Sequence, residues 1–259
     1  MAKHGKRYRS NLESVDREKV YEPSEAVALI KGFKSASFDE TVEAHVRTGL
    51  NVRHAEEQLR GTISLPHGLG KEMTVAVFAK GDKAREAEEA GADHVGADDL
   101  AKRVEEEGFT DFDVAIATPD MMPVVGKLGR ILGPQGKMPN PKVGTVTNDV
   151  AKAVSESKAG KVEYRTDRQA IVHLAIGKTS FDERRLLDNY IAVIEEIVRA
   201  KPAAAKGRYI LSITMTPTMG PGVRVDPNVT RPGEILASAP RGDGDAGGAE
   251  QGETAAASA

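Results

Sequence analysis

The change of pattern that decides the fold lies in residues 61–78, GTISLPHGLGKEMTVAVF. Residues 61–65 predict a short strand, and the Pro and Gly residues of 66–70 end it. Residues 74–78 then form an unbroken apolar run, which is typical of a strand that is covered on both faces. Such a change within twenty residues indicates a boundary between two kinds of sheet.

The residues before this boundary predict a helix and a half-buried strand. Residues 23–32 open with Pro-Ser-Glu and carry an apolar face, which indicates a helix. Residues 41–47 alternate between polar and apolar side chains, the period of a strand with one face in water. Residues 1–9 are basic, and we expect either an arm that contacts phosphates or a solvated terminus.

After the boundary, predicted strands and helices alternate. Strands near 94–95 and at 114–117 are separated by helices at 83–90 and 98–107, and a further helix is expected at 148–159. This order predicts a small doubly wound α/β domain with a parallel sheet. Residues 126–144 are rich in Gly and Pro and contain four cations, so they fit a nucleic-acid loop or a structural connector equally well; the cations are Lys127, Arg130, Lys137 and Lys142.

The first pattern returns after Gly160. Strands are expected at 161–165, 170–175 and 209–215, with a long amphipathic helix at 182–199. The sequence therefore predicts a split α+β domain, 1–68 and 160–229, that is interrupted by an α/β domain at 69–159. Residues 230–259 are mostly Gly, Ala, Ser and acid, and we expect a disordered tail because they can bury little apolar surface.

The formal net charge of −3 hides an uneven distribution. The tail carries two basic and five acidic residues, and the inserted segment carries 12 and 16. The two outer segments hold the remaining 22 basic and 18 acidic residues, so this part of the chain is mildly basic.

The absence of Cys excludes disulfides and thiolate sites, and no apolar run is long enough for a membrane span. We expect a cytoplasmic protein.

No motif specifies catalysis. Residues 133–137, GPQGK, are too short for a phosphate-binding P-loop, and Met138 stands where such a loop needs Ser or Thr. The six His residues show no metal-ligand spacing, so we expect no enzyme activity, cofactor or metal. Two functions other than nucleic-acid binding stay open, namely a nucleotide-binding enzyme that uses the inserted domain and a protein–protein scaffold that uses its acidic helices.

Several ordered blocks together resemble one family. They are FDETVE at 38–43, residues 60–71, EAGAD at 89–93, LGRILGP at 128–134, MPNP at 138–141 and TMGP at 218–221. The chain, from about Lys3 to Asn228, is similar to the family of the bacterial large-subunit ribosomal protein one. The resemblance implies an RNA-recognition-like split domain with an α/β insertion, monomeric when free of the ribosome. It also implies binding to the rRNA stalk junction, assistance to release of deacylated tRNA from the exit site, and repression of its own operon mRNA.

The resemblance further implies an RNA-binding surface without stacked aromatics. Its residues would be Ser37, Phe38, Thr41 and Glu43 on one strand, Arg165, Asp167, Arg168 and His173 on a hairpin, and Thr218, Met219 and Gly220 at the tip of the last strand. The arginines would neutralise phosphates, and Thr218 with the Gly220 backbone would contact 2′-hydroxyls. Phe38 would brace this platform or pack on a sugar, although in isolation a Phe at a strand start is expected in the core.

Overall fold

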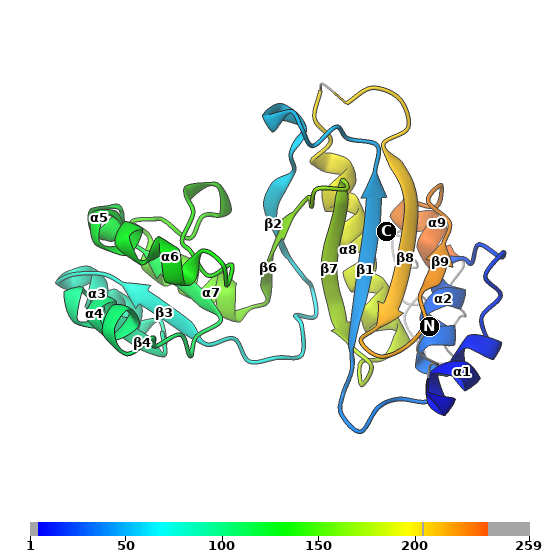
Figure 1. The fold of residues 1–259 in the computed structure, drawn as a ribbon, viewed down its shortest axis with the longest axis horizontal. Coiled ribbons are helices and arrows are strands. Elements are labelled where there is room, and N and C mark those ends of the chain that lie inside the picture. Colours follow the sequence, from blue (N-terminus) through cyan, green and yellow to red (C-terminus); the bar gives the residue numbers. More distant parts are fainter. Residues whose placement is uncertain (1–4, 204, 238–259) are drawn as a thin grey trace, which may run out of the picture.

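The computed structural model describes residues 5–203 and 205–237 and shows a mixed α/β fold with three separate sheets (Figure 1). The sheets have four, two and three strands. The third sheet and its helices lie at the opposite end of the long axis from the four-stranded sheet. No helix in the described part of the chain has the length and apolar character that a bilayer span requires.

The four-stranded sheet is antiparallel, and we call it the main sheet. Its strand order is β7 (Ile171–Lys178), β1 (Thr41–Thr48), β8 (Ile210–Pro217) and β9 (Val223–Val225). Val42, Ala44 and Val46 are fully buried, whereas the side chains between them reach the other face, which confirms the predicted alternation. The main sheet is therefore covered on one face and open on the other.

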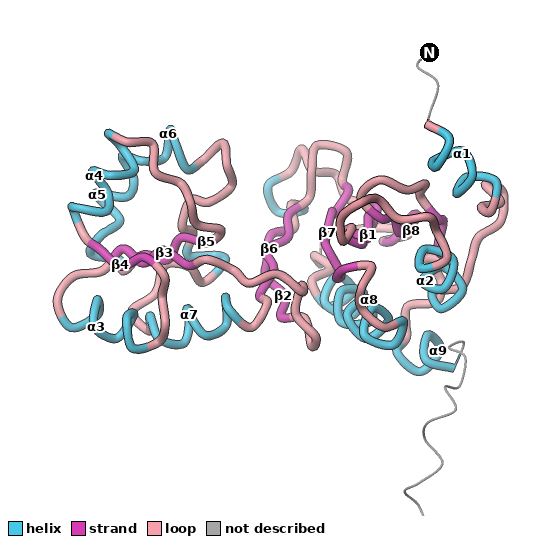
Figure 2. The backbone as a smooth tube through the Cα atoms, turned by 90° about the horizontal axis from the view of Figure 1, so that it is seen from below, coloured by secondary structure: helices cyan, strands magenta, loops and turns pink. Residues whose placement is uncertain are grey.

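Helices α2 (Pro23–Lys31) and α8 (Glu183–Arg199) provide that cover (Figure 2). Both were predicted, and the apolar stripe of α8 packs against the sheet as its period requires. One polar side chain, Asn189, is fully buried in α8. Its amide donates to the carbonyls of Ile176 and Gly68, and its side-chain oxygen accepts from the His67 N–H. Asn189 thus attaches residues 67 and 68 to the core of the main sheet.

The second sheet is an antiparallel pair, β2 (Arg60–Ser64) and β6 (Lys161–Arg165). Its buried side chains include Ile63 and Tyr164, which belong to the same apolar cluster as the core of the main sheet. The second sheet carries the chain away from the main sheet and back again (Figure 1).

The third sheet is parallel, as the buried runs predicted, with order β4 (His94–Gly96), β3 (Val75–Phe78), β5 (Val114–Ala117). Helices cover both faces (Figure 2). Side chains of α3 (Asp82–Glu89) and α7 (Val150–Lys158) pack with Val75 and Val77 on one face. Side chains of α4 (Asp98–Glu106), α5 (Met122–Val125) and α6 (Gly129–Leu132) pack with Ala76 and Phe78 on the other.

The Gly/Pro stretch 126–144 is more regular than a loop. It contains η3 (Gly126–Leu128), α6 and η4 (Pro141–Val143), three short helical segments. Lys137 points inward, because its ammonium donates to the Thr110 carbonyl at 2.8 Å and lies 5.5 Å from the centre of the Phe112 ring. For Lys137, these contacts favour the structural alternative.

Three local predictions were wrong. Part of the expected basic arm is a helix, α1 (Lys6–Glu13), and the three-residue strand β9 was missed because its run is so short; residues 1–4 lie outside the described part. The expected disordered segment begins too early, since α9 (Pro232–Ala237) is helical and Ile235 is fully buried in the main core. The rest of the predicted tail, from residue 238 onward, lies outside the described residues.

Candidate nucleic-acid interface

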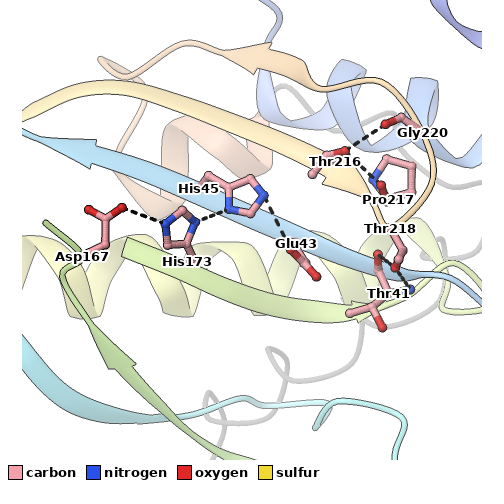
Figure 3. Close-up of polar contacts among 9 residues, drawn as sticks. All are labelled: Thr41, Glu43, His45, Asp167, His173, Thr216, Pro217, Thr218 and Gly220. Atoms are coloured by element: carbon pink, nitrogen blue, oxygen red, sulfur yellow. Dashed lines mark hydrogen bonds and ion pairs between the residues drawn. The ribbon is translucent and has the colours of Figure 1, made fainter. Parts of the chain in front are cut away.

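Most of the predicted RNA-binding residues fall into two groups beside or on the open face of the main sheet. The tip group comprises Ser37, Phe38, Thr41, Thr218, Met219 and Gly220, where β1 begins and β8 ends. The central group comprises Glu43, Asp167 and His173, together with His45, which was not predicted. Both groups combine residues from distant parts of the chain (Figure 3).

The tip group is held together by Thr41 and Thr218. The Thr218 N–H donates to the Thr41 carbonyl at 3.0 Å, and the Thr41 N–H donates to the Thr218 hydroxyl oxygen, also at 3.0 Å (Figure 3). The Lys178 ammonium donates to the Thr41 hydroxyl at 2.9 Å. These bonds extend the β1–β8 pairing past the end of the strand, so the turn that follows Pro217 has a fixed start.

A buried carboxylate, Glu40, joins the two loops of the tip group. Glu40 is 3% exposed, and it accepts from the Ala36 N–H at 2.6 Å and from the Met219 N–H at 2.9 Å. Its neighbour Asp39 fixes the same loop to Thr179 and Ser180. Burial raises the pKa of Asp39, but hydrogen bonds from Ser180 and Thr179 outweigh it and hold that pKa below its ordinary value.

Two large apolar side chains stand out on the loops that Glu40 fixes. Phe38 is 51% exposed and Met219 is 50% exposed, although the backbone around both is held by hydrogen bonds. The expectation that Phe38 lies in the core is therefore wrong, because it sits in the bend before β1 rather than on its inward face. An exposed ring and thioether on a fixed backbone can pack against a sugar or a base.

The central group forms a line of four side chains from β1, β7 and the turn before β7. His45 and His173 are directly opposite each other, with 2.9 Å between their Nδ1 atoms. Nε2 of His45 lies 3.6 Å from Glu43 Oε2, and Nε2 of His173 lies 3.4 Å from Asp167 Oδ2 (Figure 3). We call this line the His relay. Its carboxylates can accept hydrogen bonds from hydroxyl or amino groups of a ligand.

The electrostatics of the His relay follow from its packing. Burial lowers the pKa of His45, and the facing His173 lowers it further, whereas Glu43 opposes the shift. Burial raises the pKa of Asp167, but bonds from the Ile171 and Gln169 N–H groups outweigh it and give a net decrease. Asp167 is therefore an anion near neutral pH.

The two arginines that were predicted to bind RNA, Arg165 and Arg168, do not lie on the open face of the main sheet. Arg165 is the last residue of β6 in the second sheet, directly opposite Arg60, whose guanidinium pairs with Glu163. Arg168 lies in the exposed turn between β6 and β7, next to Asp167. The predicted residues thus form a face with a cationic margin rather than one compact patch.

Sequence reasoning missed several residues of this face. His45, Thr214 and Arg224 form one row with His173, since each is the register partner of the next across β7, β1, β8 and β9. The alternation in 41–47 already placed His45 with Glu43, which was a usable signal, but Arg224 belongs to the undetected β9. Among the described residues, no group of three or more His, Asp or Glu side chains is arranged to hold a metal ion.

Comparison with known proteins gives consistent results. Residues 30–221 match the family described as Ribosomal protein L1p/L10e family. The chain is also similar to the large ribosomal subunit protein uL1 of Thermobifida fusca (strain YX), with 57% identity over 229 residues. That alignment covers 88% of this chain and 97% of the relative.

Proposed function

The chain belongs to the ribosomal protein L1p/L10e family, and from this premise we propose that it binds large-subunit rRNA through the open face of the main sheet. It is a structural, non-enzymatic protein of the large subunit, located in cytoplasmic ribosomes. The nucleotide-enzyme and scaffold alternatives are given up, because neither fits this membership.

The tip group is the observation that carries the proposal. Glu40 and the Thr41–Thr218 bonds fix two loops so that the side chains of Phe38 and Met219 are both about half exposed, whereas the Gly220 N–H and carbonyl are bonded to Pro217 and Thr216. This surface offers the exposed Thr218 hydroxyl, and its described residues include no pair of aromatics that could form a stacking platform. It suits recognition of an RNA backbone and its 2′-hydroxyls by shape.

We infer that the RNA is the junction of the rRNA stalk, bound by the two groups of this face together. Arg168 and Arg165, at its margin, would neutralise phosphates that continue past the sheet. The same surface would bind a stretch of the protein's own operon mRNA that mimics the junction and so repress translation. Placed on the stalk, the protein would also contact exit-site tRNA and assist its release.

We also propose that the chain consists of two domains, with 69–159 inserted between 1–68 and 160–229. In support, the apolar clusters of the third sheet contain only residues from 75–154, whereas the main cluster contains none of these. The two connecting segments meet at Gly68 and Gly160, both with positive φ. A Cβ on Gly160 would lie 2.7 Å from the Gly68 Cα, so the chain leaves and returns at one point.

The test is binding to a short rRNA stalk-junction fragment and to an unrelated hairpin, at near-physiological salt. Thr218→Ala and Met219→Ala should each weaken junction binding by about 1–3 kcal/mol and leave hairpin binding unchanged. Thr230→Ala, close to the outer side of α8, is the matched control and should bind like wild type. Equal, weak binding of both RNAs with the same salt dependence would refute the proposal.

A further inference from the structure

When both imidazoles are neutral, the His relay has one N–H fewer than its three contacts would use. These contacts are the Nδ1–Nδ1 contact at 2.9 Å, the Asp167 contact at 3.4 Å, and the Glu43 contact, which at 3.6 Å is an ion-pair rather than a hydrogen-bond distance. A carboxylate can only accept, so Glu43 and Asp167 each favour an N–H on the Nε2 that faces them. The contact between the two Nδ1 atoms needs one further N–H, donated by one ring and accepted by the other. The complete line therefore uses three N–H groups, whereas two neutral imidazoles supply two.

In the neutral state, one carboxylate must face a bare ring nitrogen. The ring that donates from Nδ1 has no proton on Nε2, so its lone pair points toward the oxygen of Glu43 or Asp167. One added proton removes this conflict and gives the pair a single positive charge. A second added proton would place two N–H groups against each other across 2.9 Å, so the arrangement accepts one proton only.

The surroundings of the pair supply charges of both signs. On β1 the pair is flanked by Glu43 and Arg47, and on the turn before β7 by Asp167 and Arg168. β8 contributes the uncharged Thr214 opposite His45, and β9 contributes Arg224 beyond it. Further along β7, Lys178 is engaged with Thr41. The pair therefore contacts two carboxylates, Glu43 and Asp167, while Arg47 lies two residues from His45, the same separation along β1 as Glu43.

We propose that His45 is a positioning residue of the RNA-binding face and that the His45–His173 pair takes up one proton when RNA binds. This inference rests on the proposed function, because it assigns a regulation to the same face. An approaching phosphate backbone favours added positive charge, and the protonated pair holds Glu43 and Asp167 in place as acceptors for 2′-hydroxyls. By linkage, RNA then binds more tightly as pH falls.

The experiment measures the dissociation constant for the junction fragment between pH 5.5 and 8.0 at constant ionic strength. Uptake of one proton strengthens binding by at most about tenfold per pH unit, and we expect roughly threefold or more from pH 7.5 to 6.0. His45→Gln should flatten this dependence, since Gln keeps hydrogen-bonding groups but does not titrate. His54→Gln, an exposed His outside the sheet, should keep the wild-type dependence.

A second measurement counts protons directly in the wild-type protein and in His45→Gln. Calorimetry of RNA binding near pH 6.5, in buffers of different ionisation enthalpy, counts the protons taken up per complex. Net uptake that disappears in His45→Gln supports the inference and excludes titration of the RNA as its source. Absence of uptake in wild type, or equal pH dependence in His45→Gln and wild type, overturns it. If the junction is not preferred over the hairpin at any pH, the proposed function itself fails.

Discussion

Replacement of Glu40 by Gln tests whether a buried carboxylate organises the tip group that we propose binds RNA. Gln matches the shape of Glu but offers one acceptor oxygen, while its NH2 group would face either the Ala36 or the Met219 N–H. One hydrogen bond to a charged acceptor is lost, and a buried donor is left without a partner. These are two sides of one broken hydrogen bond, which costs about 1.5–3 kcal/mol, so we expect Glu40→Gln to lower the free energy of unfolding by about 2 kcal/mol.

The same substitution should weaken binding to the junction RNA, because the Met219 N–H fixes the loop that carries Thr218 and Gly220. Urea denaturation measures the stability change, and fluorescence anisotropy with labelled RNA measures the affinity. Glu105→Gln, an exposed side chain on α4, is the matched control and should change neither quantity. If Glu40→Gln keeps both the stability and the affinity of wild type, the tip does not depend on this carboxylate and the reasoning fails.

Three further predictions concern the connecting segments, the cationic margin and the core. Gly160→Ala should destabilise the protein by about 1–3 kcal/mol in urea denaturation, since φ is +96° and the new Cβ would lie 2.7 Å from the Gly68 Cα. Because we place Arg168 against a phosphate, Arg168→Ala should reduce the slope of log affinity against log salt concentration by about one unit. The affinity should fall by a similar factor for the junction and for the hairpin. Burial and the nearby Glu196 raise the pKa of Tyr164 to about 12, so its contribution to stability is full below about pH 10 and is lost as pH rises through 12. Denaturation midpoints from pH 9 to 12 should therefore fall less steeply in Tyr164→Phe than in wild type.

The sequence pattern alone was enough to predict those strands along which burial is either continuous or alternates regularly. The unbroken apolar run at 74–78 predicted a strand with both faces covered, and β3 has four buried residues and helices on either side. The polar–apolar alternation at 41–47 predicted which side chains of β1 face outward. In both cases burial is set by the immediate neighbours in the sheet, which the local pattern already encodes.

The candidate site was less predictable because its key contacts join distant positions. Glu40 precedes Val42 and Ala44 at a spacing of two residues, so in an extended chain all three side chains point to the same face. The sequence therefore already showed an acidic residue at an inward position. Its partners were not visible, since Met219 lies 179 positions away and meets Glu40 only when β1 pairs with β8. The His45–His173 contact depends in the same way on the register of β1 with β7, which no local pattern determines.

The position of the insertion explains how a chain with net charge −3 can present a face to a polyanion. β1 comes from the segment before residues 69–159 and is flanked by β7 and β8 from the segment after them, so the proposed RNA-binding face is formed by strands from 1–68 and 160–229. The inserted residues carry four surplus negative charges, yet the third sheet lies at the far end of the long axis (Figure 1). Exposed charges are largely screened beyond about 8 Å at physiological ionic strength. RNA bound at the proposed face would therefore interact mainly with the outer segments, whose net charge is +4, so the overall charge is a poor guide to what this face can bind.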